Sequence, residues 1–223
     1  MTIKYAFKQS IPIMAGYLVL GMGFGVLLQS KGYGIFWAFI MSAFIYAGSM
    51  QFVTIDLLSG GATLIASALM TLMVNARHLF YGISMIDRYK DTKPYKPYLI
   101  FSLTDETYSL VCSGEVPEGV DQTKYYFFVS LLDQCYWVIG CIVGNLIGSL
   151  ISFNSTGIDF AMTSLFLVVF VEQWQSTKNH LSAIIGVASS IICLLIFGAD
   201  NFIIPTMISI TILLTVLRGI LHE

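Results

Sequence analysis

Apolar runs of about 20 residues recur along the whole chain, and they limit the folds that are open to it. Several of these runs reach or approach the length that a helix needs to cross the hydrocarbon core of a bilayer. Hydrophobic residues make up 57% of the 223 residues and charged residues 11%, with a mean hydropathy of +0.80. The alternation typical of transmembrane β-strands is missing. The sequence therefore predicts an all-α, polytopic helical membrane protein with about seven transmembrane segments, in a range of about six to eight.

Polar or glycine-rich turns divide the apolar runs into segments. The segments cover 11–28, 35–58, 62–86, 98–113, 124–151, 158–174, 181–197 and a last stretch to Leu217. Pro12 and the glycines from Gly16 to Gly25 favour a first segment that is broken, re-entrant or tightly packed inside the bundle. The whole chain, 1–223, is expected to form a single integral membrane domain.

An internal echo suggests that this domain has two related halves. At an offset of 123 residues, Gly21 and Gly25 fall on Gly144 and Gly148. The echo predicts repeat halves at 11–97 and 124–217. Transporters built from such repeats place their substrate site near the midplane, where broken helices meet.

Basic residues predict the orientation. The polar loop 87–96 holds Arg88 and three lysines, and Lys4 and Lys8 precede the first apolar run. Cytoplasmic loops are enriched in Lys and Arg, so both stretches are expected in the cytoplasm, whereas the acidic loop 114–123 suits the outer face. Three segments separate two stretches expected on one side. One of the three must then fail to cross, and we expect the glycine-rich first segment to be that one.

Polar residues interrupt the third segment. Asn75, Arg77 and His78 lie inside an otherwise apolar run. An ionisable side chain within a membrane helix is by default a hypothesis of function. Two other interpretations stay open, because Arg77 can snorkel toward the headgroups and His78 can be a hydrogen-bonded packing residue.

A second polar cluster lies in the second segment, where Tyr46, Gly48, Ser49 and Gln51 place hydroxyls, an amide and bare backbone close together. Helix packing explains the small residues, but a buried Gln51 must find partners for both its donor and its acceptor. We expect these four residues and Asn75 to contact a substrate.

Two adjacent carboxylates, Asp105 and Glu106, lie in the middle of the fourth segment. At membrane depth they are candidates for proton coupling or for binding a substrate ammonium, with Arg77 and His78 tuning their charge. The alternative is a short interfacial or re-entrant piece in which both carboxylates are hydrated, since the segment is marginal for spanning.

Glycines recur every four residues in the fifth segment, at Gly140, Gly144 and Gly148. This ridge predicts a packing face, and it is also a place where a partner helix or a small subunit could dock. The four cysteines lack metal-ligand spacing, so neither a metal site nor another cofactor is expected.

Four motifs in this order resemble the AzlC family, the large subunit of bacterial branched-chain amino acid exporters. They are the glycine-rich first segment, SAFIYAGSMQF, NARHLFYG and LTDETYSL. The resemblance is strongest over 16–108 and weakens after Trp137. It implies export of valine, leucine, isoleucine and their analogues, a small AzlD-type membrane subunit as partner, and a multi-pass location in the bacterial inner (plasma) membrane.

The predicted function is therefore proton-coupled secondary export of branched-chain amino acids, with exposed helix N-termini of the first segment receiving the substrate carboxylate. The alternatives are an exporter of another small metabolite and a non-catalytic channel or assembly subunit. An enzyme is not expected, because the sequence has no HExxH or GxSxG motif. The lipid bilayer is an expected partner, nucleic acid is not, and a homo-oligomer stays open.

Overall fold

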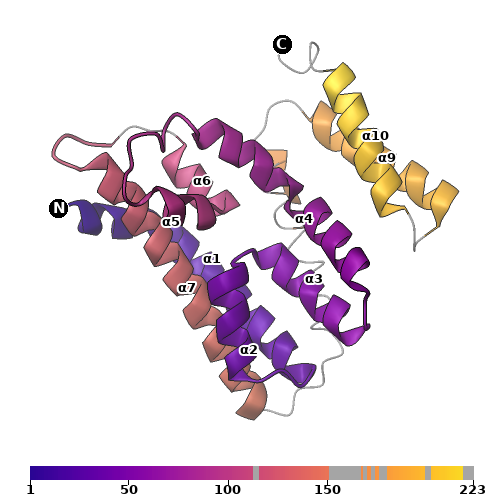
Figure 1. Ribbon diagram of the computed structural model, residues 1–223, viewed down its shortest axis with the longest axis horizontal. Coiled ribbons are helices and arrows are strands. Elements are labelled where there is room, and N and C mark those ends of the chain that lie inside the picture. Colours follow the sequence, from indigo (N-terminus) through magenta and orange to yellow (C-terminus); the bar gives the residue numbers. More distant parts are fainter. Residues whose placement is uncertain are drawn as a thin grey trace. The chain divides into compact units, whose positions relative to one another are not determined.

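The described chain is built from helices, and its described residues contain no strand (Figure 1). The computed structural model describes residues 1–112, 116–150, 180–198 and 202–217, with positions 167, 170, 171, 174 and 175. Two compact units are present, Met1–Met162 and Thr163–Glu223. The all-α prediction is confirmed.

Two long helices, α1 (Thr2–Ser30) and α7 (Gln122–Leu150), lie side by side in the first unit (Figure 1). Each has 29 residues and is long and apolar enough to cross a membrane. The helices run parallel, because the start of α1 meets the start of α7 and Gly25 faces Gly144 further along both. Helix α1 continues through Pro12, so the expectation of a broken or re-entrant first segment is wrong. The third alternative, tight packing, is correct, because the glycines of α1 allow it to pack closely against α7.

Glycines on both helices allow this contact. A Cβ atom added to Gly21 would lie 3.0 Å from the backbone of Trp137 and Cys141, and one added to Gly25 or Gly144 would overlap backbone atoms of the opposite helix. The glycine ridge of α7 is a packing face, as the sequence predicted. Because α1 already covers it, the ridge at Gly144 is not the docking face for a small subunit that the sequence also suggested.

The second segment forms a helical hairpin instead of one helix. It consists of α2 (Ile35–Ile40), the π-helical turn η1 (Met41–Ile45) and α3 (Gly48–Ser59). Tyr46 joins the two arms in the left-handed region, with φ of 41°. We call residues 35–59 hairpin A.

Contacts with α1 and α7 show that hairpin A enters and returns. The Asn145 side chain donates to the Tyr33 carbonyl at the base of the hairpin, and the Gln134 side chain donates to the Ala43 carbonyl near its tip. Helix α3 then runs back toward the base, where the ring of Phe52 packs against Phe24 of α1. Backbone that leaves the helix at membrane depth is tolerated only where protein or a cavity surrounds it.

Helix α4 (Leu64–Met85) returns the chain to the end of the unit where it began. Met85 joins a buried apolar cluster that contains Ala6 of α1 and Tyr126 of α7. The N-terminus and the basic loop therefore lie at one end, as the positive charges predicted. The segment that fails to cross is hairpin A and not the first segment.

A second hairpin, which we call hairpin B (96–111), enters from the opposite end to hairpin A. Its arms are α5 (Lys96–Phe101) and α6 (Asp105–Val111), so the fourth segment is not one spanning helix. The Val111 carbonyl at its base accepts from Arg88, and Thr104 at its tip reaches Tyr17 in the middle of α1. The tips meet there, with the ring of Tyr46 6.4 Å from that of Phe101.

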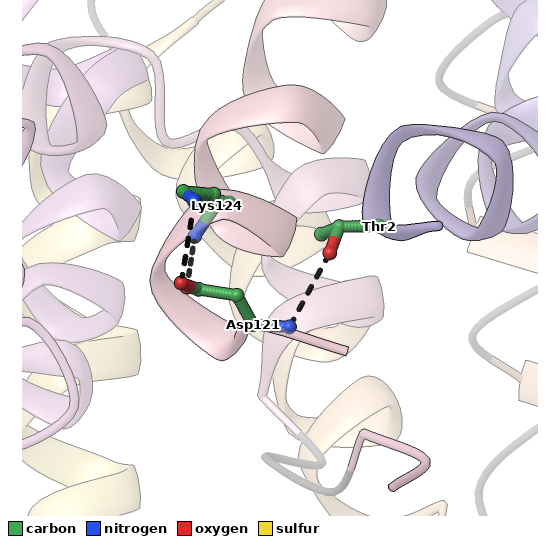
Figure 2. A network of polar contacts seen from close by, with 3 residues as sticks. All are labelled: Thr2, Asp121 and Lys124. Atoms are coloured by element: carbon green, nitrogen blue, oxygen red, sulfur yellow. Dashed lines mark hydrogen bonds and ion pairs between the residues drawn. The ribbon is translucent and has the colours of Figure 1, made fainter. Parts of the chain in front are cut away.

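The start of α7 shows where the acidic loop lies (Figure 2). The backbone N–H of Asp121 donates to Thr2 Oγ1, and the Asp121 carboxylate caps α7 by accepting from the backbone N–H of Lys124 at 2.9 Å. The Lys124 ammonium lies 3.8 Å from the same carboxylate. The described part of the loop thus shares the end that holds the N-terminus. Because hairpin B returns to the end from which it entered, an acidic loop on the outer face and a cytoplasmic N-terminus cannot both hold.

The second unit contains α9 (Leu181–Phe197) and α10 (Ile203–Val216), which pack on each other. Helix α9 matches the predicted segment and ends at Gly198, whose φ of 75° suits glycine. Most of the predicted segment 158–174 lies outside the described residues. The repeat halves 11–97 and 124–217 stay a prediction.

Candidate functional site

A cavity of about 420 Å³ lies between α4, the tip of hairpin A and the first arm of hairpin B. This volume falls within the range of small-ligand sites. The residues that line it come from segments far apart in the sequence. They are Ile45, Tyr46, Ala47, Asn75, His78, Gly82, Met85, Ile86, Tyr89, Lys96, Ile100, Phe101 and Leu103.

Three polar atoms in the cavity wall are buried without a hydrogen bond to any described residue. They are Asn75 Oδ1 and the hydroxyls of Tyr46 and Tyr89. Buried polar groups are normally paired, so these atoms are free to bind a ligand or water. Tyr46 and Tyr89 are only 4% and 2% exposed. Burial raises the pKa of the Tyr89 phenol further above its usual value.

Positive partial and full charges adjoin the same cavity. Helix α3 begins at Gly48, directly after two wall residues, and its N-cap residue Ala47 supplies no side-chain hydrogen bond. The first N–H groups of a helix lack intrahelical partners and attract anions. Lys96 adds an ammonium group to the wall. The cavity can therefore hold an anionic group beside Tyr46.

A chain of hydrogen bonds joins two carboxyl groups in the middle of the unit. The Tyr17 hydroxyl donates to Glu106 Oε2 at 2.6 Å and lies 2.7 Å from Thr104 Oγ1. The Thr104 hydroxyl donates to Thr107 Oγ1 at 3.1 Å, and the Thr107 hydroxyl donates to Asp133 Oδ2 at 2.8 Å. Asp133 is 0% exposed, and its Oδ1 has no hydrogen bond to a described residue.

Comparison with known sequences gives the family. The family model described as AzlC protein matches residues 12–151, which is more than half of the chain. The chain belongs to the AzlC family. No solved structure matches it.

Several relatives of this AzlC-family chain cover most of its length. It is 47% identical to the branched-chain amino acid transport protein AzlC of Bacillus subtilis, over 99% of this chain and 87% of the relative. It is 43% identical to a membrane protein of Helicobacter pylori strain J99, over 96% and 94% of the two chains. The inner membrane protein YgaZ of Escherichia coli is 25% identical over 77% of this chain and 73% of its own length. Together these findings identify a helical membrane protein and support a transport role.

The AzlC-family fold brings some of the predicted site residues together and separates others. Tyr46, Asn75 and His78 line the cavity. Gly48 and Gln51 face the indole of Trp137 on α7 instead. Ser49 is buried in the first turn of α3, and Arg77 lies in α4 with a side chain outside the described part. Asp105 and Glu106 begin α6, where Glu106 joins the hydrogen-bonded chain.

Four residues of the hydrogen-bonded chain were not predicted as site residues from the sequence. Tyr17, Thr104 and Thr107 are unremarkable in the sequence, because their roles depend on contacts between segments. Asp133 offered a signal, since it is an acidic residue inside the long apolar run of α7. Its neighbour Gln134 offered the same signal.

The contact between Gln51 and Trp137 can be measured directly. Trp137 Nε1 donates to Gln51 Oε1 at 2.7 Å in the buried core. Gln51→Leu should lower the free energy of unfolding by about 1–3 kcal/mol, because it leaves the indole N–H unpaired. In a Trp137→Phe background the same change should cost less, because that donor is already gone. Chemical denaturation of all four proteins in detergent measures the difference, and equal costs in both backgrounds would contradict the contact.

Proposed function

We propose that this protein is a secondary transporter that exports branched-chain amino acids, coupled to protons, in the bacterial cell membrane. The observation that carries the proposal is a cavity that joins anion-attracting groups, unpaired acceptors and an apolar wall. An aliphatic amino acid has three matching parts: a carboxylate, an ammonium and a branched hydrocarbon side chain.

Each part of such a substrate has a partner in the wall. Lys96 and the start of α3 suit the carboxylate. Asn75 Oδ1 and the Tyr46 and Tyr89 oxygens are acceptors for the ammonium. Apolar side chains complete the wall where the hydrocarbon would lie. They are Ile45, Met85, Ile86, Ile100, Phe101 and Leu103. The sequence placed the substrate carboxylate at helix N-termini within the first segment. We propose the start of α3 instead, because α1 is unbroken.

The position of the cavity supports export. Met85 and Tyr89 of its wall belong to the buried cluster at the end that holds the basic loop. By the excess of Lys and Arg this end faces the cytoplasm. The cavity therefore lies on the cytoplasmic side of the hairpin tips, where an exporter loads its substrate.

The family supports the remaining parts of the proposal. An AzlD-type small membrane subunit is the proposed partner, and the relative from Bacillus subtilis is named for branched-chain amino acid transport. The protein is proposed to move its substrate without changing it, as a carrier and not as an enzyme.

Exchange of labelled leucine in proteoliposomes tests the function, with this chain alone and with an AzlD-type subunit. Asn75→Leu should lower the apparent affinity for leucine at least about tenfold, because it removes a polar partner of the ammonium. Thr71→Val is the matched control, since Thr71 lies one turn earlier on α4, is exposed and bonds only within its helix. Valine and isoleucine should compete, whereas lysine and glutamate should not. Absence of leucine exchange in both preparations would contradict the proposal and direct the search to another small metabolite.

A further inference from the structure

We propose that Glu106, Tyr17, Thr104, Thr107 and Asp133 form a single proton-binding unit that holds one excess proton, shared between its two carboxyl ends. Four hydrogen bonds lead from hairpin B to α1, back to hairpin B and on to α7. The unit lies beside the cavity and has no role in holding the substrate's hydrocarbon.

The unit has one more hydrogen bond than it has hydroxyl protons. Three hydroxyls stand between the carboxyls, and each hydroxyl can donate one proton. Four hydrogen bonds need four protons, so two ionised carboxylates leave one bond unmade. A single added proton on either carboxyl completes the chain, with every hydroxyl pointing away from that end. A second added proton would have no acceptor within the chain.

The Thr104 oxygen has no lone pair left for a competing arrangement. It accepts from the backbone N–H of Thr107 at 3.2 Å, which caps α6. Its second lone pair accepts from a neighbour in the chain, and its proton goes to the other neighbour. The direction of the whole chain therefore reverses when the proton moves from one carboxyl to the other.

The surroundings favour a protonated unit. Among the described side chains the one ion pair is between Lys124 and Asp121, so no described cation neutralises Asp133 or Glu106. Burying a charge without a partner is costly. Apart from the Glu106 carboxyl at the other end of the unit, the groups that interact with Asp133 are phenols and a hydroxyl from α5, α6, α7 and hairpin A. They are Tyr98, Thr107, Tyr125, Tyr136 and Tyr46.

The unit links a partly exposed carboxyl to the cavity. Glu106 is partly exposed, whereas Asp133 is fully buried. The Tyr46 hydroxyl lies beside Tyr17 without a well-formed hydrogen bond, interacts with Asp133, and lines the cavity. A proton that enters at Glu106 can reach Asp133 by successive transfer along the hydroxyls, each of which accepts one proton and passes on another. Resting on the proposed function, we infer that this proton is the one exchanged for the amino acid.

Infrared titration of the protein in lipid tests the unit without any substrate. Wild-type protein should show one protonated-carboxyl band that is lost in Asp133→Asn. Tyr17→Phe leaves both carboxyls but cuts the chain, so the two threonine hydroxyls then satisfy an ionised Asp133. The pH midpoint of the band should fall by about one unit or more. Tyr126→Phe is the matched control, because it removes another buried phenol, whose described hydrogen bond is with Gln122 outside the unit.

An unchanged or raised midpoint in Tyr17→Phe would overturn the proposal, since burial alone would then explain the protonated carboxyl. Absence of the band in wild type at neutral pH would overturn it as well. Leucine transport gives the second measurement. Tyr17→Phe should reduce proton-driven accumulation at least about tenfold while exchange of leucine for leucine continues. If wild-type protein shows no leucine exchange but gives the expected infrared result, the proposed substrate is wrong. The proposal of a proton-binding unit would still hold.

Discussion

Gly144→Ala is expected to destabilise the first unit by about 3 kcal/mol or more, because the added methyl group has no space. It would overlap the backbone of Met22 on α1, and backbone atoms cannot move aside as a flexible side chain can. Alanine favours the helical state over glycine by about 1 kcal/mol, so any loss of stability runs against the intrinsic preference of the helix. The fraction of monodisperse protein and the thermal midpoint in detergent report the effect.

Three substitutions serve as graded controls for that experiment. Gly25→Ala removes the same clearance from the side of α1 and should be equally harmful. Gly148→Ala meets the Gln29 side chain and the Val26 backbone at 3.1 and 3.2 Å, so its effect should be smaller. Gly16→Ala meets no atom within 4 Å and should be neutral or slightly stabilising. Equal stability of Gly144→Ala and Gly16→Ala would contradict the parallel packing of α1 and α7.

Gln134→Leu is expected to abolish most transport, because one amide holds both hairpins to α7. Its Nε2 donates to the Ala43 carbonyl at 3.0 Å, and its Oε1 accepts from the Tyr98 hydroxyl at 2.6 Å. The π-helical turn changes the backbone hydrogen bonding of hairpin A around Ala43, and the side-chain amide donates to this carbonyl there. A leucine side chain at position 134 leaves the Ala43 carbonyl and the Tyr98 hydroxyl unpaired. Each unpaired group lowers the free energy of unfolding by about 1–3 kcal/mol.

Leucine exchange in proteoliposomes measures this loss, and limited proteolysis shows whether the hairpins have loosened. Tyr98→Phe is the matched comparison, because it removes only the bond to hairpin B and leaves the amide on Ala43 in place. It should keep more activity than Gln134→Leu. Normal exchange by Gln134→Leu would show that the tips do not depend on this amide.

The sequence was sufficient to predict an all-α fold, but not the path that the chain takes between its helices. The apolar run 35–58 is long enough to cross a bilayer, and nothing local distinguishes a crossing from a return. The return depends on Tyr46 in a left-handed conformation and on contacts with α7 more than eighty residues away in the sequence. The glycines of α1 suggested a break because a glycine looks the same whether it bends a helix or admits another one.

The candidate site was predictable to the extent that polar residues interrupt apolar runs. Tyr46, Asn75 and His78 were singled out on that ground, and they line one cavity. The same ground applied to Asp133, but its importance appears only when Thr107 is placed against it. Hydroxyl residues carry no such signal, since a threonine in a membrane helix usually bonds to its own backbone.

The parallel pairing of α1 and α7 also has a consequence for synthesis. Synthesis of α1 is complete 120 residues before synthesis of α7 is complete. During that interval the glycine face of α1 stands in the bilayer without its partner, and hairpin A lacks its hydrogen bonds to Gln134, Trp137 and Asn145 of α7. The first unit can close only after its last long helix has been inserted. Truncated chains that end before α7 should therefore be recognised as unfinished and degraded, however many of their helices are already in the membrane.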